Sequence, residues 1–576
     1  MKVFFPSKET FYAPGEEIPI RARDRYTALD NKTVQALKIG QGRIAFLIFC
    51  FMTVFAVMVG RLFQLTVLQR TRFVEQNSVF AQAPRADIVD RNGTILAISL
   101  PIVDLYIDAR KVENPKEIAR RLVKVLPDLD LKETYAKIAS KSSFKYLKRN
   151  LTPKEQNAVN RLGIPILNFE TRTQRIYPQG ALFSHILGLT NIDDVGVSGI
   201  EKAFNHRLSS SSAALQLSVD ANVQEKVRSV LMEYASKFEA AGAAAIVMDV
   251  NTQEILSMVS LPDYDPNQGR ETLSNALFNR ATLGIYESGS IMKVFAVALG
   301  LESGKIKPDD MIDATKPYKL ANYMISDYRG QNRPLTVSEV LIHSSNIGSS
   351  KIALMVGGEK QKEFLEKLGF LSPLVFELPE KARPRFPKVW RDINTATISY
   401  GYGLATSPLH VLTALSTLVN GGYYRPPTLL RHGNADRPQM QVLTEKTSRI
   451  IRHMMRAVAD IGSGKRANVK GYLVGGKTGS AEMQDERGRY IPGSLRTSFI
   501  AAFPMDKPRY AVIVMMENPK KTKETAGFNT AGWNVVPCAG KIIEKIAPYL
   551  GVAPRPEEEQ PSYIQASYKL SLSKRK

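Results

Sequence analysis

Apolar residues fall into a few patterns along the chain, and the first pattern predicts a membrane anchor. Residues 44–60, "IAFLIFCFMTVFAVMVG", carry no charge, and the apolar character continues past Arg61 as "LFQLTVL". Seventeen uncharged residues reach the lower limit for crossing a bilayer, and Arg61 can extend its charge to the far interface. A buried core helix would normally show a polar face, and a signal peptide would have a small-residue cleavage site soon after the run. We therefore expect an uncleaved anchor.

After this run, the pattern alternates between strand and helix signals. "ADIVDRNGTILAIS" predicts a β-hairpin around Asn92-Gly93, because this pair tolerates the positive φ angles of a tight turn. Residues 114–165 show apolar residues at helical spacing, and "LSSSSAAL" at 208–215 indicates a linker or an exposed turn. Further strands are expected at "GAAAIVMDV", "EILSMVSL", "YLVGGKTGSAEM" and "YAVIVMME", the first two forming a hairpin.

Composition adds a charge argument to this picture. The chain has 576 residues and a formal net charge of +23, so it is long enough for several domains and suits an anionic partner. Lys and Arg are scattered along the chain and form no recognisable nucleic-acid-binding module, so we do not expect a nucleic-acid partner. We favour a basic protein that works near an anionic membrane. The first 43 residues hold eight Lys and Arg, which predicts a cytoplasmic tail with the rest of the chain outside the cytoplasm. Only Cys50 and Cys538 occur, too far apart in sequence to indicate a structural disulfide or a compartment.

The candidate chemistry begins at "YESGSIMKVF", where Ser290 precedes Lys293 by three residues at the start of an apolar run ending near Gly304. This spacing on a buried helix brings the lysine amine within reach of the serine oxygen. The amine can act as a base only when burial or a nearby positive charge lowers its pKa. The same spacing occurs at three other places, where no companion motif supports it: Ser142/Lys145, Ser571/Lys574 and Ser573/Lys576.

Two further motifs follow Ser290 in order. Ser344-Ser345-Asn346 lies in "HSSNIGSSK", and the only Lys-Thr-Gly in the chain opens Lys477-Thr478-Gly479-Ser480. Together the three motifs are the set of penicillin-binding proteins and serine β-lactamases.

With these residues in place, the chain resembles the class B penicillin-binding proteins over the anchor and nearly all of residues 85–551. Asn346 resembles the division-specific subclass, the FtsI or penicillin-binding protein 3 type, whereas elongation-specific relatives more often have Asp there. Several N-terminal segments resemble the motifs of the family's non-catalytic region: Arg85, Asp90-Arg91-Asn92-Gly93, residues 175–188, and Gly196, Gly199, Ile200 and Glu201.

The resemblance implies an α+β multidomain fold. Its transpeptidase domain would contain a five-stranded antiparallel sheet flanked by helices, with a helical subdomain. The implied organisation, from the N-terminus, is a cytoplasmic tail (1–43), one transmembrane helix (44–66), an elongated non-catalytic periplasmic module (67–212), the penicillin-binding transpeptidase domain (213–553) and a flexible tail (554–576).

The resemblance also implies a role for each motif residue. Ser290 would attack the penultimate D-Ala carbonyl of a stem peptide, Lys293 would accept its proton, Ser344 would relay protons, and Asn346 would hold the substrate amide. The strand residues would bind the terminal carboxylate: Lys477 by charge, Thr478 and Ser480 by their hydroxyls, within the motif completed by Gly479. The backbone N–H groups of Ser290 and Ser480 would form the oxyanion hole.

The implied function is a peptidoglycan D,D-transpeptidase of the bacterial inner membrane, acting in septal cell-wall synthesis. Its partners would be stem peptides, β-lactams bound covalently at Ser290, a SEDS-family glycan polymerase and other division proteins of the membrane. No cofactor or metal is implied.

Three departures and three alternatives qualify this interpretation. The family usually has Pro at the position of Ser288, Gly at that of Ala86 and often Thr at that of Ser480. Loss of the proline would loosen the start of the helix and change acylation by β-lactams.

The alternatives are an elongation-specific relative, a catalytically weak β-lactam sensor or division scaffold, and a β-lactamase, which needs a deacylating base that the sequence does not reveal.

Overall fold

A computed structural model of the chain describes residues 31–63, 85–271, 274–432, 437–485 and 487–556. The chain divides into two compact units, residues 1–82 and 83–576. The residue ranges expected for finer domains stay predictions, and the predicted C-terminal tail lies almost entirely outside the described residues, together with its two Ser-x-x-Lys matches.

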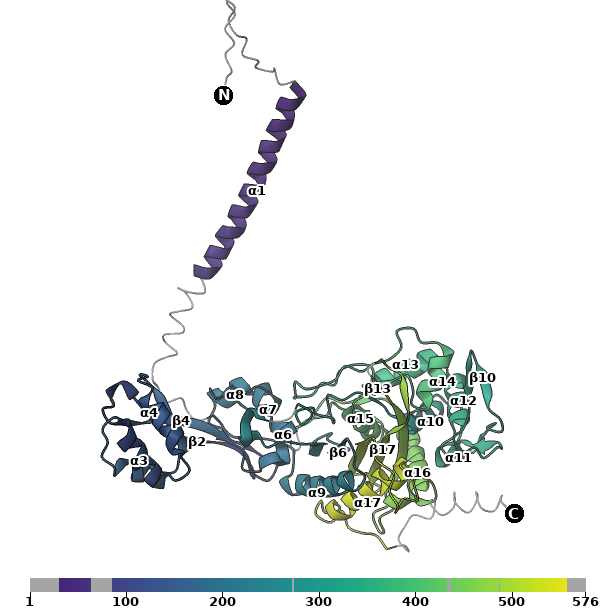
Figure 1. Cartoon of the computed structure of the whole chain (residues 1–576). Coiled ribbons are helices and arrows are strands. Elements are labelled where there is room, and N and C mark those ends of the chain that lie inside the picture. Colours follow the sequence, from purple (N-terminus) through teal and green to yellow (C-terminus); the bar gives the residue numbers. More distant parts are fainter. Residues whose placement is uncertain (1–30, 64–84, 272–273, 433–436, 486, 557–576) are drawn as a thin grey trace, which may run out of the picture. The chain divides into compact units, whose positions relative to one another are not determined.

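The first unit contains one long helix, α1 (Asn31–Phe63), which includes the whole charge-free run (Figure 1). Its large apolar side chains between Phe46 and Leu62 are exposed. Across the described ranges, however, no helix combines the length and the apolar composition that a membrane crossing requires. Residues 64–66 of the expected anchor lie outside these ranges, so the transmembrane part of the predicted fold is not confirmed.

The N-terminal part of the second unit is built on a mixed sheet. The predicted hairpin is present: β1 (Ile88–Val89) pairs antiparallel with β2 (Ile95–Ile107), and β1 also pairs parallel with β5 (Leu215–Gln216). The long strand β2 continues outward between β3 (Lys145–Leu151) and β4 (Leu167–Ile176). Helices α3 (Pro115–Val125), α4 (Leu131–Ala139) and α5 (Pro153–Asn160) share a separate apolar core with these strands.

One part of the helical prediction for residues 114–165 is wrong. Residues 145–151, "KYLKRNL", form strand β3 because pairing with β2 and burial of Leu147 and Leu151 outweigh the local lysine-rich pattern. Ser142 of the decoy motif lies in the preceding loop and Lys145 begins the strand, so this pair does not share a helix face. Of the linker or exposed turn predicted at 208–215, residues 208–210 end the short helix α8 (Asn205–Ser210) and Leu215 begins β5. Only residues 211–214 form a largely exposed loop.

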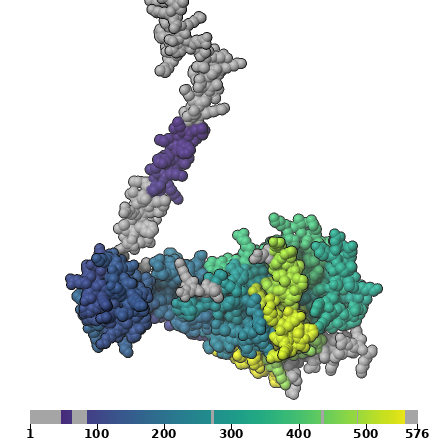
Figure 2. All heavy atoms as spheres, viewed as in Figure 1, coloured from purple at the N-terminus to yellow at the C-terminus, as the bar shows by residue number. Residues whose placement is uncertain are grey.

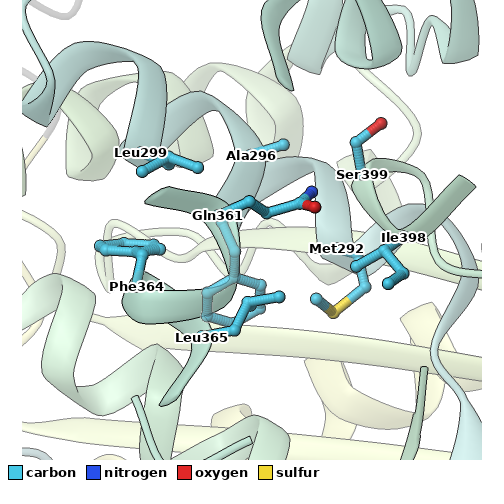
Figure 3. A pocket seen from close by; sticks show the side chains of 9 residues that line it. Met292, Ala296, Leu299, Gln361, Phe364, Leu365, Ile398 and Ser399 are labelled. Atoms are coloured by element: carbon cyan, nitrogen blue, oxygen red, sulfur yellow. The ribbon is translucent and has the colours of Figure 1, made fainter. Parts of the chain in front are cut away.

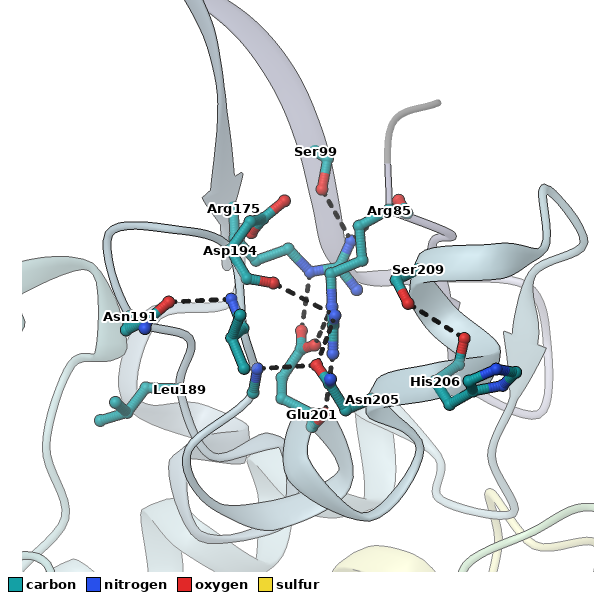
Figure 4. A network of polar contacts seen from close by, with 12 residues as sticks. Arg85, Ser99, Arg175, Leu189, Asn191, Asp194, Glu201, Asn205, His206 and Ser209 are labelled. Atoms are coloured by element: carbon teal, nitrogen blue, oxygen red, sulfur yellow. Dashed lines mark hydrogen bonds and ion pairs between the residues drawn. The ribbon is translucent and has the colours of Figure 1, made fainter. Parts of the chain in front are cut away.

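A buried ion network ties the ends of this N-terminal module together (Figure 4). The Glu201 carboxylate, fully buried on helix α7 (Gly199–Ala203), accepts from Arg85 Nε and from Arg175 Nε at 2.7 Å each. Arg85 also donates to the Asn205 side chain and to the Glu201 backbone oxygen. Three chain segments far apart in sequence therefore meet on one carboxylate.

The C-terminal part of the second unit is organised around a five-stranded antiparallel sheet, as predicted. Its strand order is β16 (Gly475–Gln484), β17 (Tyr490–Phe503), β18 (Tyr510–Glu517), β6 (Gly242–Asp249) and β7 (Ile255–Leu261). Along β6, Ala243, Ala245 and Val247 enter one core while the intervening residues enter the other. Because both faces of the sheet are covered, the sequence of β6 is a continuous apolar run.

Helices cover the two faces of this sheet. One face packs against α9 (Ala221–Lys237) and α17 (Val535–Ile546), drawn in blue and yellow in Figures 1 and 2. The other packs against α15 (Pro408–Val419) and α16 (Glu445–Asp460), beside the buried helix α10 (Met292–Glu302). The helical subdomain around α10 is completed by α11 (Val337–Ile342), α12 (Asn346–Val356), α13 (Gly358–Lys367) and α14 (Asp392–Ser399).

A small, mostly apolar cavity lies behind α10 (Figure 3). Met292, Phe295, Ala296 and Leu299 of α10 face side chains of α13 and α14 there. The one amide in the lining, Gln361, is hydrogen-bonded to the Thr395 backbone oxygen and the Trp390 indole. The back of α10 is thus fixed by apolar packing, which leaves its first turn to present polar groups on the other side.

Candidate active site

Three segments converge at one edge of the five-stranded sheet. They are the 3₁₀ turn η5 (Gly289–Ile291), the loop before α12, and strand β16. Gly479 on β16 permits the closest approach, because a Cβ there would lie 2.4 Å from the backbone oxygen of Ser288. The absence of a side chain at this position lets η5 lie directly against the strand, which brings the Ser-x-x-Lys and Lys-Thr-Gly motifs together.

Ser290 and Lys293 lie where α10 begins. Ser290 is half-buried within η5 rather than in the helix itself, and Lys293 belongs to the first turn of α10, where its side chain is buried. Within the described part of the chain the Ser290 hydroxyl has no hydrogen-bond partner. Catalytic hydrogen bonds commonly tighten only when substrate is bound, so a hydroxyl without a partner is still suited to act as the nucleophile.

Ser344 lies between two buried lysines. Its backbone adopts φ +58°, a left-handed conformation that is uncommon for a residue other than glycine. In this conformation its Oγ accepts from Lys293 Nζ at 3.1 Å and from Lys477 Nζ at 3.0 Å, and its backbone oxygen also accepts from Lys293. The hydroxyl therefore connects the side-chain nitrogens of two different motifs. A strained backbone conformation at such a position is typical of a functional site.

Burial makes these lysines unusual. The pKa of Lys293 is well below its ordinary value, first because the amine is buried and then because Lys477 is nearby, while Asp327 opposes the shift. Burial lowers the pKa of Lys477 to about 7. Burial and the neighbouring Lys477 thus shift Lys293 toward its neutral form, and a neutral amine with a free electron pair is what a base for a serine nucleophile requires.

The Ser-x-Asn loop is held by Asp327, a residue that the sequence motifs did not identify. Asp327 Oδ2 accepts from the Ser345 hydroxyl at 2.7 Å, and Oδ1 accepts from the Ile347 backbone N–H at 3.0 Å. Ser345 in turn caps α12 by accepting from Gly348 N at 2.9 Å. An aspartate in a loop between short strands has no sequence signature, so only the fold shows that it fixes the start of α12.

Asn346 presents its side chain beside the same loop. Its Nδ2 donates to the Ser326 backbone oxygen at 2.8 Å, which fixes the orientation of the amide. The residue is partly exposed.

The strand end of the site carries two hydroxyls with partners of their own. Thr478 Oγ1 lies 2.7 Å from the hydroxyl of Ser463, which the motifs also missed. Ser480 Oγ accepts from the backbone N–H of Ala531 at 3.2 Å, at the start of the turn η7 (Ala531–Trp533). The hydroxyls of Thr478 and Ser480 therefore lie beside the Ser463 hydroxyl and the Ala531 backbone N–H. Hydroxyl and N–H groups of this kind can bind a carboxylate.

The structure brings all eight motif residues into one region. Ser288, where the family usually has Pro, starts η5 with φ −87° and makes no capping hydrogen bond with its side chain. The altered start of the turn is thus compatible with an ordered site, and its effect on acylation stays a prediction.

Comparison with known proteins agrees with this architecture. Residues 243–532 match the penicillin-binding protein transpeptidase domain, and residues 80–237 match the penicillin-binding protein dimerisation domain. The chain belongs to the penicillin-binding protein transpeptidase family, and the resemblance found in the sequence is confirmed.

Relatives extend the match over most of the chain. A probable peptidoglycan D,D-transpeptidase FtsI from Caulobacter vibrioides is 38% identical over 493 residues, covering 83% of each chain. The peptidoglycan D,D-transpeptidase FtsI of Escherichia coli K12 is 29% identical over 553 residues, covering 89% of this chain and 92% of its own. The crystal structure of penicillin-binding protein 3 from Mycobacterium tuberculosis, complexed with aztreonam, has a TM-score of 0.65 at 22% identity and covers 82% of this chain and 98% of its own.

Proposed function

We propose that this protein is a peptidoglycan D,D-transpeptidase that cross-links stem peptides through an acyl-enzyme on Ser290. One observation carries the proposal most directly. The Ser344 hydroxyl accepts from both Lys293 and Lys477, and this joins the three motifs into one proton-transfer unit next to Ser290. The FtsI relatives support the reaction class and a role in septal synthesis.

In the first half-reaction, Ser290 Oγ adds to the carbonyl carbon of the penultimate D-Ala as its proton passes to Lys293. The peptide C–N bond then breaks, and the terminal D-Ala leaves with a proton delivered through Lys293 and Ser344. The backbone N–H groups of Ser290 and Ser480 bind the oxygen on which negative charge develops. The product of this step is an ester between the donor peptide and Ser290.

Residues of strand β16 and of the Ser-x-Asn loop share the recognition of the substrate. Lys477, Thr478 and Ser480 bind the terminal carboxylate, since a buried ammonium and two hydroxyls supply charge and hydrogen bonds to an anion. The Asn346 amide holds the backbone of the donor peptide. No step in this scheme requires a cofactor.

An assay with a donor pentapeptide and an amine acceptor tests the proposal. We expect release of D-Ala and formation of the cross-linked product by the full chain in detergent, and loss of both in Ser290→Ala. Lys477→Ala should lose activity on the peptide acid far more than on its amide. Activity that survives Ser290→Ala would overturn the proposed nucleophile.

We also propose that residues 44–66 anchor the protein in the bacterial inner membrane, with the N-terminus cytoplasmic and the catalytic domain periplasmic. The charge-free run and the exposure of its apolar side chains support the anchor, and the eight basic residues before it support the orientation. Protease added to intact spheroplasts should digest the catalytic domain and spare the segment before Ile44. Protection of the catalytic domain would overturn the topology.

A membrane position would place the enzyme beside the source of its glycan substrate. We propose a SEDS-family glycan polymerase and other division proteins of the membrane as partners, with the N-terminal module as the docking region. Co-purification of the full chain with a polymerase, lost when residues 67–212 are replaced by an unrelated periplasmic domain, would support this partnership. Unchanged co-purification would place the contact elsewhere.

A further inference from the structure

A surface of arginine and aromatic side chains borders the carboxylate-binding end of the site. We call it the shelf, and it consists of Arg329, Arg466, Phe528 and Trp533. The Phe528 and Trp533 rings stack with centroids 5.5 Å apart and an interplanar angle of 11°. Arg466 lies with its guanidinium carbon 3.7 Å from the Trp533 ring centroid and donates to the Gly532 backbone oxygen at 2.9 Å. One cation is therefore fixed on the aromatic pair.

The shelf is attached directly to the two hydroxyls of β16. Trp533 belongs to η7, whose first residue, Ala531, donates its backbone N–H to Ser480 Oγ. Arg466 lies on the turn η6 (Lys465–Ala467), close after Ser463, the partner of Thr478. The shelf thus continues the surface beyond the point where a terminal carboxylate would bind.

Arg329 is the one member of the shelf that comes from the helical subdomain. It follows closely after Asp327, which holds the Ser-x-Asn loop, and its guanidinium carbon lies 5.8 Å from the Phe528 ring centroid. Both Arg329 and Phe528 are exposed. Among the described residues Arg329 forms no ion pair with a carboxylate, so its charge faces solvent above an aromatic ring. This charge is available to an anionic ligand.

The chemistry of the second half-reaction indicates which ligand this is. When the terminal D-Ala leaves, the attacking amine must approach the ester carbonyl from the side of the departed group, by microscopic reversibility. The acceptor peptide therefore enters past Thr478 and Ser480, and its remaining length extends over the next surface. Stem peptides carry free carboxylates, which match the two arginines in charge.

We propose that the shelf is the binding subsite for the anionic acceptor peptide. This proposal rests on the proposed transpeptidase function and adds the location of the second substrate. The acceptor amine nitrogen adds to the ester carbonyl carbon, the bond to Ser290 Oγ breaks, the amine gives up one proton and Ser290 regains one. Arg329 and Arg466 touch none of these reacting atoms. They raise the occupancy of the acceptor over that of water.

The test measures how the acyl-enzyme divides between acceptor and water. The full chain in detergent is given a soluble thioester analogue of the donor and an acceptor tripeptide bearing one free amine and one free carboxylate. We expect Arg329→Glu to lower the ratio of aminolysis to hydrolysis by about fivefold or more, the effect of an ordinary exposed ion pair that is lost and replaced by repulsion. The acylation rate by penicillin should stay within about twofold, because hydrolysis and acylation do not use the shelf.

Two controls keep the outcome specific. Arg120→Glu makes the same change of charge at one exposed position of α3 in the N-terminal module. This variant should leave the ratio of aminolysis to hydrolysis unchanged. An acceptor tripeptide amide, lacking the carboxylate, should react equally with wild type and Arg329→Glu. A ratio unaffected by Arg329→Glu, or affected equally for acid and amide, would overturn the shelf as the acceptor site. If wild type forms no acyl-enzyme at all, the proposed function fails instead.

Discussion

Burial gives the two lysines of the site pKa values far below that of a free lysine side chain. Burial brings the pKa of Lys477 to about 7, and the pKa of Lys293 lies well below its ordinary value. Lys293 is therefore shifted toward its neutral form, while Lys477 keeps its charge below about pH 7. This division gives a base and an anion-binding group within hydrogen-bond reach of the same hydroxyl, Ser344.

This difference predicts a pH dependence. Lys477 carries its charge below about pH 7 and loses it above. The second-order rate constant for acylation by a penicillin with a free carboxylate should therefore fall as pH rises through about 7, approaching tenfold per pH unit, because this constant reports the free enzyme. Stopped-flow acylation measurements would show it. The methyl ester of the same penicillin should lack the decline, and equal pH profiles for acid and ester would contradict the assignment.

The sequence predicted the reacting residues but not the groups that place them. Ser290, Lys293, Ser344 and Lys477 belong to short motifs whose order along the chain is informative. Asp327 and Ser463 lie in loops without a distinctive pattern, and their partners come from distant segments. Such contacts depend on the packed fold, so a single sequence does not reveal them.

At the scale of elements, the start of α12 depends on Asp327. Asp327→Ala removes the acceptor for Ser345 and for the Ile347 N–H, which should let the Ser344 loop move. We expect the acylation rate to fall by about 10- to 100-fold, in line with the loss of hydrogen bonds to a charged group. Penicillin titration would separate this loss of rate from a loss of folded enzyme. Asp313→Ala, an exposed carboxylate that bonds Lys351 on the same helix, should change the rate little.

The turn η5 is fixed by a close approach of two backbones. Gly289 N donates to Gly401 O at 3.2 Å, and a Cβ on Gly401, whose φ is +102°, would lie 1.9 Å from the Gly289 oxygen. Gly401→Ala should therefore displace η5 and abolish most labelling by fluorescent penicillin.

Gly403→Ala is the matched control for this substitution. Its φ of +86° imposes similar backbone strain, of about 1–3 kcal/mol, but a Cβ there meets nothing closer than 3.6 Å. Labelling should persist in this variant. Equal labelling of the two variants would show that the close approach at Gly401 does not position Ser290.

At the scale of the whole molecule, most of the catalytic fold was predictable and the N-terminal module less so. The sheet strands β6, β7, β16 and β18 are continuous apolar runs or contain a motif, so their pattern identified them. Strand β3 looked helical because lysines and leucines alternate irregularly, and only its pairing with β2 makes it a strand. Non-local pairing of this kind is weakly encoded in local pattern.

The ion network at Glu201 makes the N-terminal module sensitive to one substitution. Glu201→Ala leaves the buried guanidinium groups of Arg85 and Arg175 without their carboxylate. The free energy of unfolding should decrease by about 3–5 kcal/mol, as for other broken buried pairs. Denaturant titration of the full chain would measure this. Glu133→Ala, which breaks an exposed pair with Lys137, should change stability little, and a similar small effect of Glu201→Ala would contradict the network's structural role.

The central claim is that Ser290 forms the acyl-enzyme, and mass spectrometry of the penicillin-treated protein tests it most directly. We predict one stable adduct, mapped by peptide fragmentation to Ser290, that decays slowly and is absent from Ser290→Ala. Ser142→Ala, at the decoy motif, should be labelled like wild type. No adduct in wild type, or an adduct on another residue, would contradict the account.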